Sequence, residues 1–211
     1  MKTNDFIDLL SADSAPVWRF GSIFGLAIVF GILISGCAFF LGIGVRPDIS
    51  QAVQSPRFLF KFVATGTLAA GATGTMLSLA RPCASLKRWS WILMAVPLLL
   101  ACAAAVELIV MPRDMWMRLL VGKNSRCCLT LVPLLAMGPL ACLLMALRQG
   151  ASEKPGVAGG LAGMAASGIA ATFYAANCTD DSPLFVATWY PLATLAIATV
   201  GYVLGVKLLK W

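Results

Sequence analysis

The 211 residues are 60% hydrophobic and only 12% charged, and the mean hydropathy is +0.87. Because an ordinary soluble domain carries about 25% charged residues, this composition excludes a soluble globular protein and favours one integral membrane domain. The net charge of +7 comes from basic residues at the ends of apolar segments, where headgroup and topology signals usually lie. We therefore expect no direct binding to nucleic acid, and the acidic start of the chain does not resemble a signal peptide.

Residues 1–19 form a predicted tail ahead of a membrane domain of residues 20–211. Phe6, Leu9 and Leu10 follow the i, i+3, i+4 spacing of one helical face, and three aspartates keep the tail acidic. Such an amphipathic helix suits a basic partner protein that offers an apolar groove. A helix that lies against its own membrane bundle explains the same pattern equally well.

Six apolar runs follow the tail, and each is long enough to cross a hydrocarbon core about 30 Å thick. They are Phe20–Gly44, Phe58–Ala80, Trp89–Val110, Cys127–Leu147, Gly156–Ala176 and Leu184–Leu208. Lipid cannot satisfy backbone hydrogen bonds, so each run must form a helix. The predicted fold class is an all-α, polytopic bundle of six transmembrane helices.

An even number of spans puts both termini on the same side of the membrane. With the termini in the cytoplasm, nine of the 16 Lys and Arg residues lie inside and seven outside, which is a weak positive-inside bias. The last outer loop contains neither Lys nor Arg. The predicted topology therefore has both termini in the cytoplasm.

Glycines recur four residues apart at three places, Gly21/Gly25, Gly159/Gly163 and Gly201/Gly205. This spacing lets helix backbones approach closely in a membrane. We favour packing within the six-helix bundle over a contact between two copies of the chain.

Two ionisable residues fall inside predicted spans, Lys61 and Glu107. Charged groups inside a membrane are costly and usually have a role. In the predicted topology both lie in the outer third of the bilayer, where they could pair with each other or extend toward the interface. The alternative is that they line the path of a small-solute or ion transporter.

The chain has no histidine, which removes the commonest general base and metal ligand. We therefore expect no enzymatic activity, no cofactor and no small-molecule substrate. Of the seven cysteines, Cys127, Cys128 and Cys178 are predicted on the outer side, which in a bacterial inner membrane is oxidising. They are the candidate exposed thiols, and Cys128, Cys178 and Asp180 are the only candidate metal ligands. Asp180 and Asp181 could instead cap the last span, which Ser182-Pro183 would begin.

Several motifs resemble those of the NrsF-type membrane anti-sigma factors. They are the segment Asn-Asp-Phe-Ile-Asp-Leu-Leu-Ser-Ala-Asp of residues 4–13, Arg46-Pro-Asp48, Ser55-Pro-Arg-Phe58, Cys128-Leu129, Leu147-Arg-Gln-Gly-Ala151 and Cys178-Thr-Asp-Asp-Ser-Pro-Leu-Phe-Val-Ala-Thr-Trp-Tyr190. The resemblance extends over essentially the whole chain. Its most specific part is the loop that begins at Cys178.

The resemblance implies six inner-membrane helices with cytoplasmic termini. It also implies a negative regulator that holds an extracytoplasmic-function (ECF) sigma factor at the membrane until envelope stress releases it. The candidate contacts with that sigma factor are then Phe6, Ile7, Leu9 and Leu10.

Two periplasmic cysteines belong to the family pattern, and here they map to Cys128 and Cys178, with Cys127 as the alternative. Many members have histidine before the loop cysteine, whereas this chain has Asn177. A family metal site that uses the imidazole therefore does not carry over, and the difference favours thiol chemistry.

Overall fold

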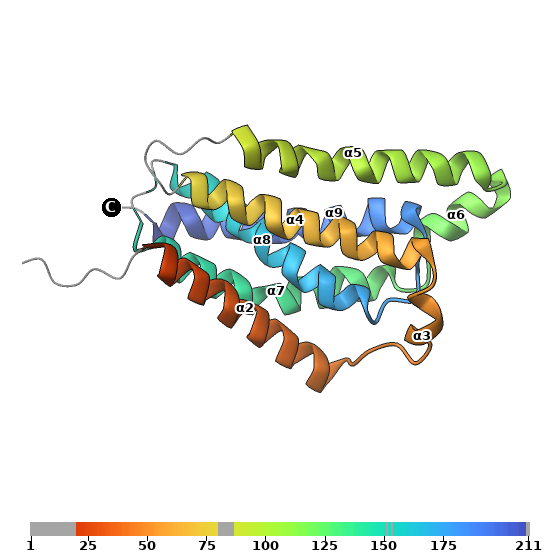
Figure 1. The fold of residues 1–211 in the computed structure, drawn as a ribbon, viewed down its shortest axis with the longest axis horizontal. Coiled ribbons are helices and arrows are strands. Elements are labelled where there is room, and N and C mark those ends of the chain that lie inside the picture. Colours follow the sequence, from red (N-terminus) through yellow and green to blue (C-terminus); the bar gives the residue numbers. More distant parts are fainter. Residues whose placement is uncertain (1–19, 80–86, 151, 153, 210–211) are drawn as a thin grey trace, which may run out of the picture.

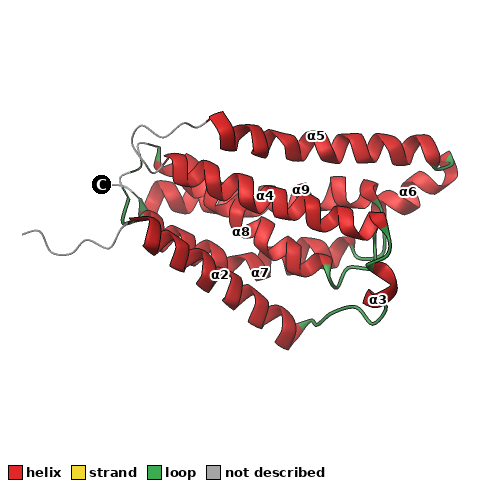
Figure 2. Cartoon of the chain, viewed as in Figure 1, coloured by secondary structure: helices red, strands yellow, loops and turns green. Residues whose placement is uncertain are grey.

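The computed structural model describes residues 20–79, 87–150, 152 and 154–209. The described chain consists of helices joined by loops, and these residues contain no strand (Figure 2). Six of the helices are long and apolar enough to cross a membrane, so the predicted fold class is confirmed. The tail residues Phe6, Ile7, Leu9 and Leu10 lie outside the described residues.

The six long helices are α2 (Phe20–Gly42), α4 (Pro56–Leu79), α5 (Lys87–Val110), α7 (Ser125–Leu147), α8 (Pro155–Ala175) and α9 (Pro183–Leu208). Each agrees with a predicted span to within two residues at either end. Two short helices were not predicted, α3 (Ile49–Ala52) and α6 (Arg113–Val121). Both are too short to span a bilayer and too polar to register as apolar runs.

The start of α2 and the end of α9 lie at one end of the bundle, and α3, α6 and the α8–α9 loop lie at the other (Figure 1). This arrangement follows from an even number of spans. We refer to the end that carries the α8–α9 loop as the loop end, and to the opposite one as the terminal end.

Helix α8 is the centre of the bundle and contacts α4, α7 and α9 (Figure 1). Most of its residues are glycine, alanine or serine, and most of them are buried. Helix α2, in contrast, is apolar all round and leaves Phe40 and Leu41 exposed by 64% and 90%. A helix that is apolar on every face belongs in a core or in lipid, so small residues select α8 for the centre and large ones place α2 outside.

The glycines of α8 and α9 pack against each other. A Cβ atom added at Gly159 would lie 2.2 Å from the backbone oxygen of Gly201, and one added at Gly163 would lie 2.5 Å from that of Ile197. The predicted close packing within the bundle is therefore confirmed for Gly159/Gly163 and Gly201/Gly205. Among the described residues, nothing lies within 4 Å of a Cβ added at Gly25, so the Gly21/Gly25 spacing is not matched there by a contact at Gly25.

Candidate sensor site at the loop end

The site is built around the loop of residues 176–182, which joins the end of α8 to the start of α9. Two cations from other parts of the chain hold this loop. Lys61 from α4 donates to the backbone oxygen of Cys178 at 2.8 Å and pairs with the Asp181 carboxylate at 2.5 Å. Arg46, which follows α2, donates to the same two groups at 3.3 Å and 2.9 Å. We call Arg46, Lys61, Asp181 and the Cys178 carbonyl the cation clamp.

The clamp is largely shielded from solvent. Lys61 is completely buried, Arg46 is 8% exposed, and the ring of Phe58 lies 5.2 Å from the Lys61 nitrogen and 5.7 Å from the Arg46 guanidinium carbon. A buried charge is tolerated only when it is paired and hydrogen-bonded. The position of Lys61 within a membrane span is therefore explained by Asp181 and by a carbonyl that points toward it.

Arg46 is also held by Asp48 through two hydrogen bonds of 2.7 Å and 2.6 Å. Hydrogen bonding to Asp48, together with Asp181, raises the pKa of the Arg46 guanidinium. The same contact lowers the pKa of Asp48 to about 2. Sequence reasoning quoted Arg46 only as part of a motif and gave it no role. The signal that could have found it is a basic residue directly before a Pro-Asp turn, on the same predicted side as Asp180 and Asp181.

Asp180 binds the start of α7. Its Oδ2 atom accepts hydrogen bonds from the backbone amides of Lys123 and Asn124 at 2.9 Å and 2.7 Å, and from the Asn124 side chain at 3.0 Å. The prediction that Asp180 and Asp181 cap the last span is therefore wrong. The two neighbouring carboxylates point to different elements, α7 and the clamp, and they tie the loop to both.

The hydrogen-bond donors at the start of α9 are instead paired with Glu107 from α5. Its Oε2 atom accepts from the Ser182 hydroxyl at 2.6 Å and from the Leu184 amide at 2.8 Å, and Oε1 lies 3.5 Å from Arg57. Lys61 and Glu107 thus neither pair with each other nor extend to the surface, because both are buried. Each holds one side of the same loop.

Cys128 and Cys178 are 0% and 1% exposed, whereas Cys127 is exposed. All three are free thiols. The expectation of exposed thiols is therefore wrong for the two that match the family pattern. It failed because tertiary contacts at the loop end bury both side chains, and helix boundaries do not reveal such contacts.

Cys128 and Cys178 are linked through shared neighbours. Both belong to the same buried cluster, and Tyr174 connects their surroundings. The Tyr174 hydroxyl donates to the Asn124 backbone oxygen at 3.3 Å, and the same oxygen accepts the Cys128 amide at 2.8 Å. The Cys178 amide in turn donates to the Tyr174 carbonyl at 3.0 Å.

Burial raises the pKa of the Cys178 thiol, against the opposing effect of the Lys61 charge. A thiol must lose its proton to react, so the resting loop keeps Cys178 protonated and shielded. The described residues gather no three cysteine or acidic side chains that could hold a metal ion. Asp180, the third candidate ligand, already accepts three N–H groups.

A family model described as "Negative regulator of sigma F" matches residues 10–211. The chain is 34% identical over 220 residues to the "Anti-sigma-F factor NrsF" of Caulobacter vibrioides, and 30% identical over 217 residues to the "Probable anti-sigma-F factor NrsF" of Azospira oryzae. Both alignments cover 100% of this chain and of the relative. No solved structure matches significantly.

Proposed function

Since the chain belongs to the family of negative regulators of sigma F, we propose that it holds an ECF sigma factor at the bacterial inner membrane and releases it on envelope stress. Family membership over the whole chain supports an anti-sigma role. The observation that supports the stress-sensing part is the burial of Cys128 and of Cys178, which belongs to the loop that the buried charges clamp. Both termini lie in the cytoplasm in this proposal, so the loop end faces the periplasm.

The tail is the proposed sigma contact, through Phe6, Ile7, Leu9 and Leu10. In sequence the tail comes before α2, and α2 begins at the terminal end of the bundle, opposite the clamp (Figure 1). A signal at the thiols therefore has to cross the membrane through the helices. Any group added to Cys178 lacks room beneath the loop, so it displaces a residue whose own carbonyl holds Lys61 and Arg46. Opening the clamp would free α4 and α2 to repack, which is the two-state element that such coupling needs.

The tail is tested by co-purifying the sigma factor with the full chain in detergent. Deleting residues 1–16 should abolish retention of the sigma factor, because it removes the apolar face of the tail. Phe6→Asp or Leu10→Asp should do the same, because the new charge would have to be desolvated in an apolar groove. Ser11→Asp adds the same charge at a polar position and should retain the sigma factor. Equal retention by all variants would remove the tail as the principal contact.

The thiols are tested by the stress response of cells that carry Cys128→Ser, Cys178→Ser or both. Each single variant should alter the response, and the double variant should be no worse than either, because the two thiols act as one pair. Cys127→Ser should respond as the wild type does. Additive single effects, or a normal response of the double variant, would contradict a coupled pair.

The orientation is tested with reporters. A fusion after Trp211 should read cytoplasmic, and one inserted near Lys123 should read periplasmic. The opposite pattern would place the clamp on the cytoplasmic side and would contradict periplasmic sensing.

The alternative role is a small-solute or ion transporter that uses Lys61 and Glu107. A transport path requires both side chains to face one passage. Glu107 lines a groove between α4 and α5, and Lys61 is not among the residues that line it. Their shared partner is the α8–α9 loop, which favours a structural role for both. Substrate-dependent flux into proteoliposomes would support the transporter.

A further inference from the structure

A groove of about 760 Å³ runs along α4 and α5 on the outside of the bundle. Its lining is almost entirely apolar, and Leu98, Val106 and Val110, which belong to it, are exposed. Ala95 and Val110 both line it and are 15 residues apart on α5, so at 1.5 Å per residue the groove is about 22 Å long. One leaflet contributes about 15 Å of hydrocarbon, half of a core about 30 Å thick. The groove is therefore long enough for one lipid acyl chain.

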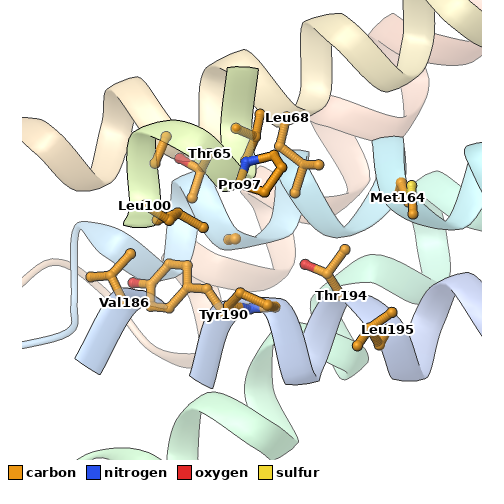
Figure 3. A pocket seen from close by; sticks show the side chains of 13 residues that line it. Thr65, Leu68, Pro97, Leu100, Met164, Val186, Tyr190, Thr194 and Leu195 are labelled. Atoms are coloured by element: carbon orange, nitrogen blue, oxygen red, sulfur yellow. The ribbon is translucent and has the colours of Figure 1, made fainter. Parts of the chain in front are cut away.

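A second cavity, of about 210 Å³, lies between α4, α5, α8 and α9 (Figure 3). The side chains around it include Leu68, Leu100 and Met164, and no charged residue of the described chain lines it. It offers nothing that would select a charged ligand. The groove between α4 and α5 differs from this cavity in the charged residues at its loop end.

At the loop end the groove meets a pocket that carries positive charge. Arg57 lines both the groove and this pocket, which has a volume of about 440 Å³. The other basic residues of the pocket are Arg118 on α6 and Lys123 just after α6. All three are exposed, so their side-chain donors are accessible to a ligand. We call Arg57, Arg118 and Lys123 the basic pocket.

The acids around the basic pocket already have partners. Of the two loop aspartates that line it, one belongs to the cation clamp and the other accepts backbone amides just before α7. Glu107 lies 3.5 Å from Arg57 and accepts from the start of α9 with its other oxygen. Within the described part of the chain, neither Arg118 nor Lys123 pairs with a carboxylate. Two positive charges of the basic pocket therefore lack a counter-ion there.

We propose that an anionic phospholipid binds along α4 and α5, with one acyl chain in the groove and its phosphate in the basic pocket. Phosphate oxygens accept charge-assisted hydrogen bonds from arginine and lysine, and basic residues near a membrane surface attract anionic lipids. The second acyl chain stays in the surrounding bilayer. Residues 179–182 also line the pocket, so the bound headgroup lies against the loop that carries Cys178. The proposal rests on the proposed membrane location and not on the anti-sigma role.

The test counts the lipids bound to the purified full-length protein by native mass spectrometry from neutral detergent micelles. The probe is dioleoylphosphatidylglycerol, and dioleoylphosphatidylcholine has the same chains with a headgroup that carries no net charge. We expect one phosphatidylglycerol to bind saturably and at least about tenfold more tightly than phosphatidylcholine. Inorganic phosphate in excess has the charge without the chain and should not displace it.

The basic pocket is tested by removing its two unpaired charges together. The double variant Arg118→Gln, Lys123→Gln should weaken phosphatidylglycerol binding about thirtyfold, which corresponds to about 2 kcal/mol. Its control is Arg113→Gln, Arg126→Gln, which removes two exposed basic residues that lie at the same end and do not line the pocket. The control should bind normally. Because both variants lose two charges, the comparison separates the pocket from general attraction between the protein and anionic lipid.

The groove is tested by filling it. Ala103 lines the groove on α5, so Ala103→Phe should weaken phosphatidylglycerol binding at least about tenfold. Ala105→Phe places the same ring at an exposed position of α5 that does not line the groove, and it should bind normally.

Four outcomes would overturn the proposal. The first is no saturable binding, or equal binding of the two phospholipids. The second is an equal loss in the two charge variants, and the third is equal binding by Ala103→Phe and Ala105→Phe. The fourth is displacement by inorganic phosphate, which would assign the basic pocket to a free anion. Sigma-factor retention is measured separately, so each of these results is distinguishable from a failure of the anti-sigma role.

Discussion

The cation clamp predicts that substituting its carboxylate, Asp181, lowers the unfolding free energy more than substituting its lysine, Lys61. Asp181→Asn removes the carboxylate that pairs with both Lys61 and Arg46. Among the described residues, it leaves the buried Lys61 ammonium with the Cys178 carbonyl and the Phe58 ring. Breaking a buried pair from one side costs about 3–5 kcal/mol. Because the Asp181 side chain is 22% exposed, we place the expected loss of unfolding free energy near the lower value, about 3 kcal/mol.

Lys61→Met should be much milder. It removes the buried charge together with its desolvation penalty, and Asp181 keeps its hydrogen bonds to Arg46. Replacing a buried ion by an apolar side chain of similar length costs about 1 kcal/mol or less. In the double variant the amide introduced at position 181 no longer faces a buried ammonium group. The double variant should therefore be more stable than Asp181→Asn alone by about 2 kcal/mol, a size seen for directly interacting residues.

The assay is unfolding by a rising mole fraction of sodium dodecyl sulfate in mild-detergent micelles, followed by tryptophan fluorescence. Asp114→Asn is the matched control, because Asp114 is an exposed acid on α6 at the same end of the bundle. It should stay within about 0.5 kcal/mol of the wild type. Equal losses for Asp181→Asn and Lys61→Met, with additivity in the double variant, would refute the reasoning that Lys61 depends on Asp181.

Three further predictions concern packing, thiol protection and pH. Gly159→Ala should lower the unfolding free energy by about 1–3 kcal/mol through overpacking, whereas Gly160→Ala, whose Cβ would meet nothing closer than 3.7 Å, should be close to neutral in the same detergent assay. In single-cysteine variants, N-ethylmaleimide at pH 7.5 should modify Cys178 at least about tenfold more slowly than the exposed Cys127, and equal rates would contradict a closed loop. The pKa of Asp48 is lowered from 3.8 to about 2 in the folded protein, so its ion pair stabilises above pH 3.8 and is lost as the pH falls toward 2. The difference in thermal midpoint between the wild type and Asp48→Asn should therefore be constant from pH 7 to about pH 5 and shrink below pH 4, and a difference that already vanishes at pH 5 would contradict this assignment.

The sequence by itself determined the number of membrane helices and their places in the chain. A run of some twenty apolar residues can be satisfied in lipid only as a helix, whatever surrounds it, so α2, α4, α5, α7, α8 and α9 follow from local composition. The glycine spacing in α8 and α9 likewise predicted close packing, because an absent side chain is a local property. Short polar helices such as α6 carry no such signal, and they were missed.

The sequence also singled out residues that meet at the loop end, Lys61, Glu107, Cys178 and the two aspartates, but it did not give their partners. Lys61 and Asp181 are 120 positions apart, and only the packing of α4 against α8 brings them together. Their place in the loop suggested, as one alternative, that Asp180 and Asp181 cap α9. In the tertiary structure Asp181 pairs with Arg46 and Lys61, and Asp180 accepts the amides of Lys123 and Asn124, just before α7.

Burial of the thiols was decided in the same way. Cys178 sits in a seven-residue connection that reads as exposed, and the hydropathy of such a stretch is unaffected by what covers it. Its shielding depends on the hydrogen bonds that Lys61 and Arg46 donate to the Cys178 carbonyl. Glu107 accepts a hydrogen bond from Ser182 at the other end of the loop. Local sequence determines where helices form, because helix hydrogen bonds are local. The burial and the partners of a charge or thiol depend instead on atoms that only the fold brings near.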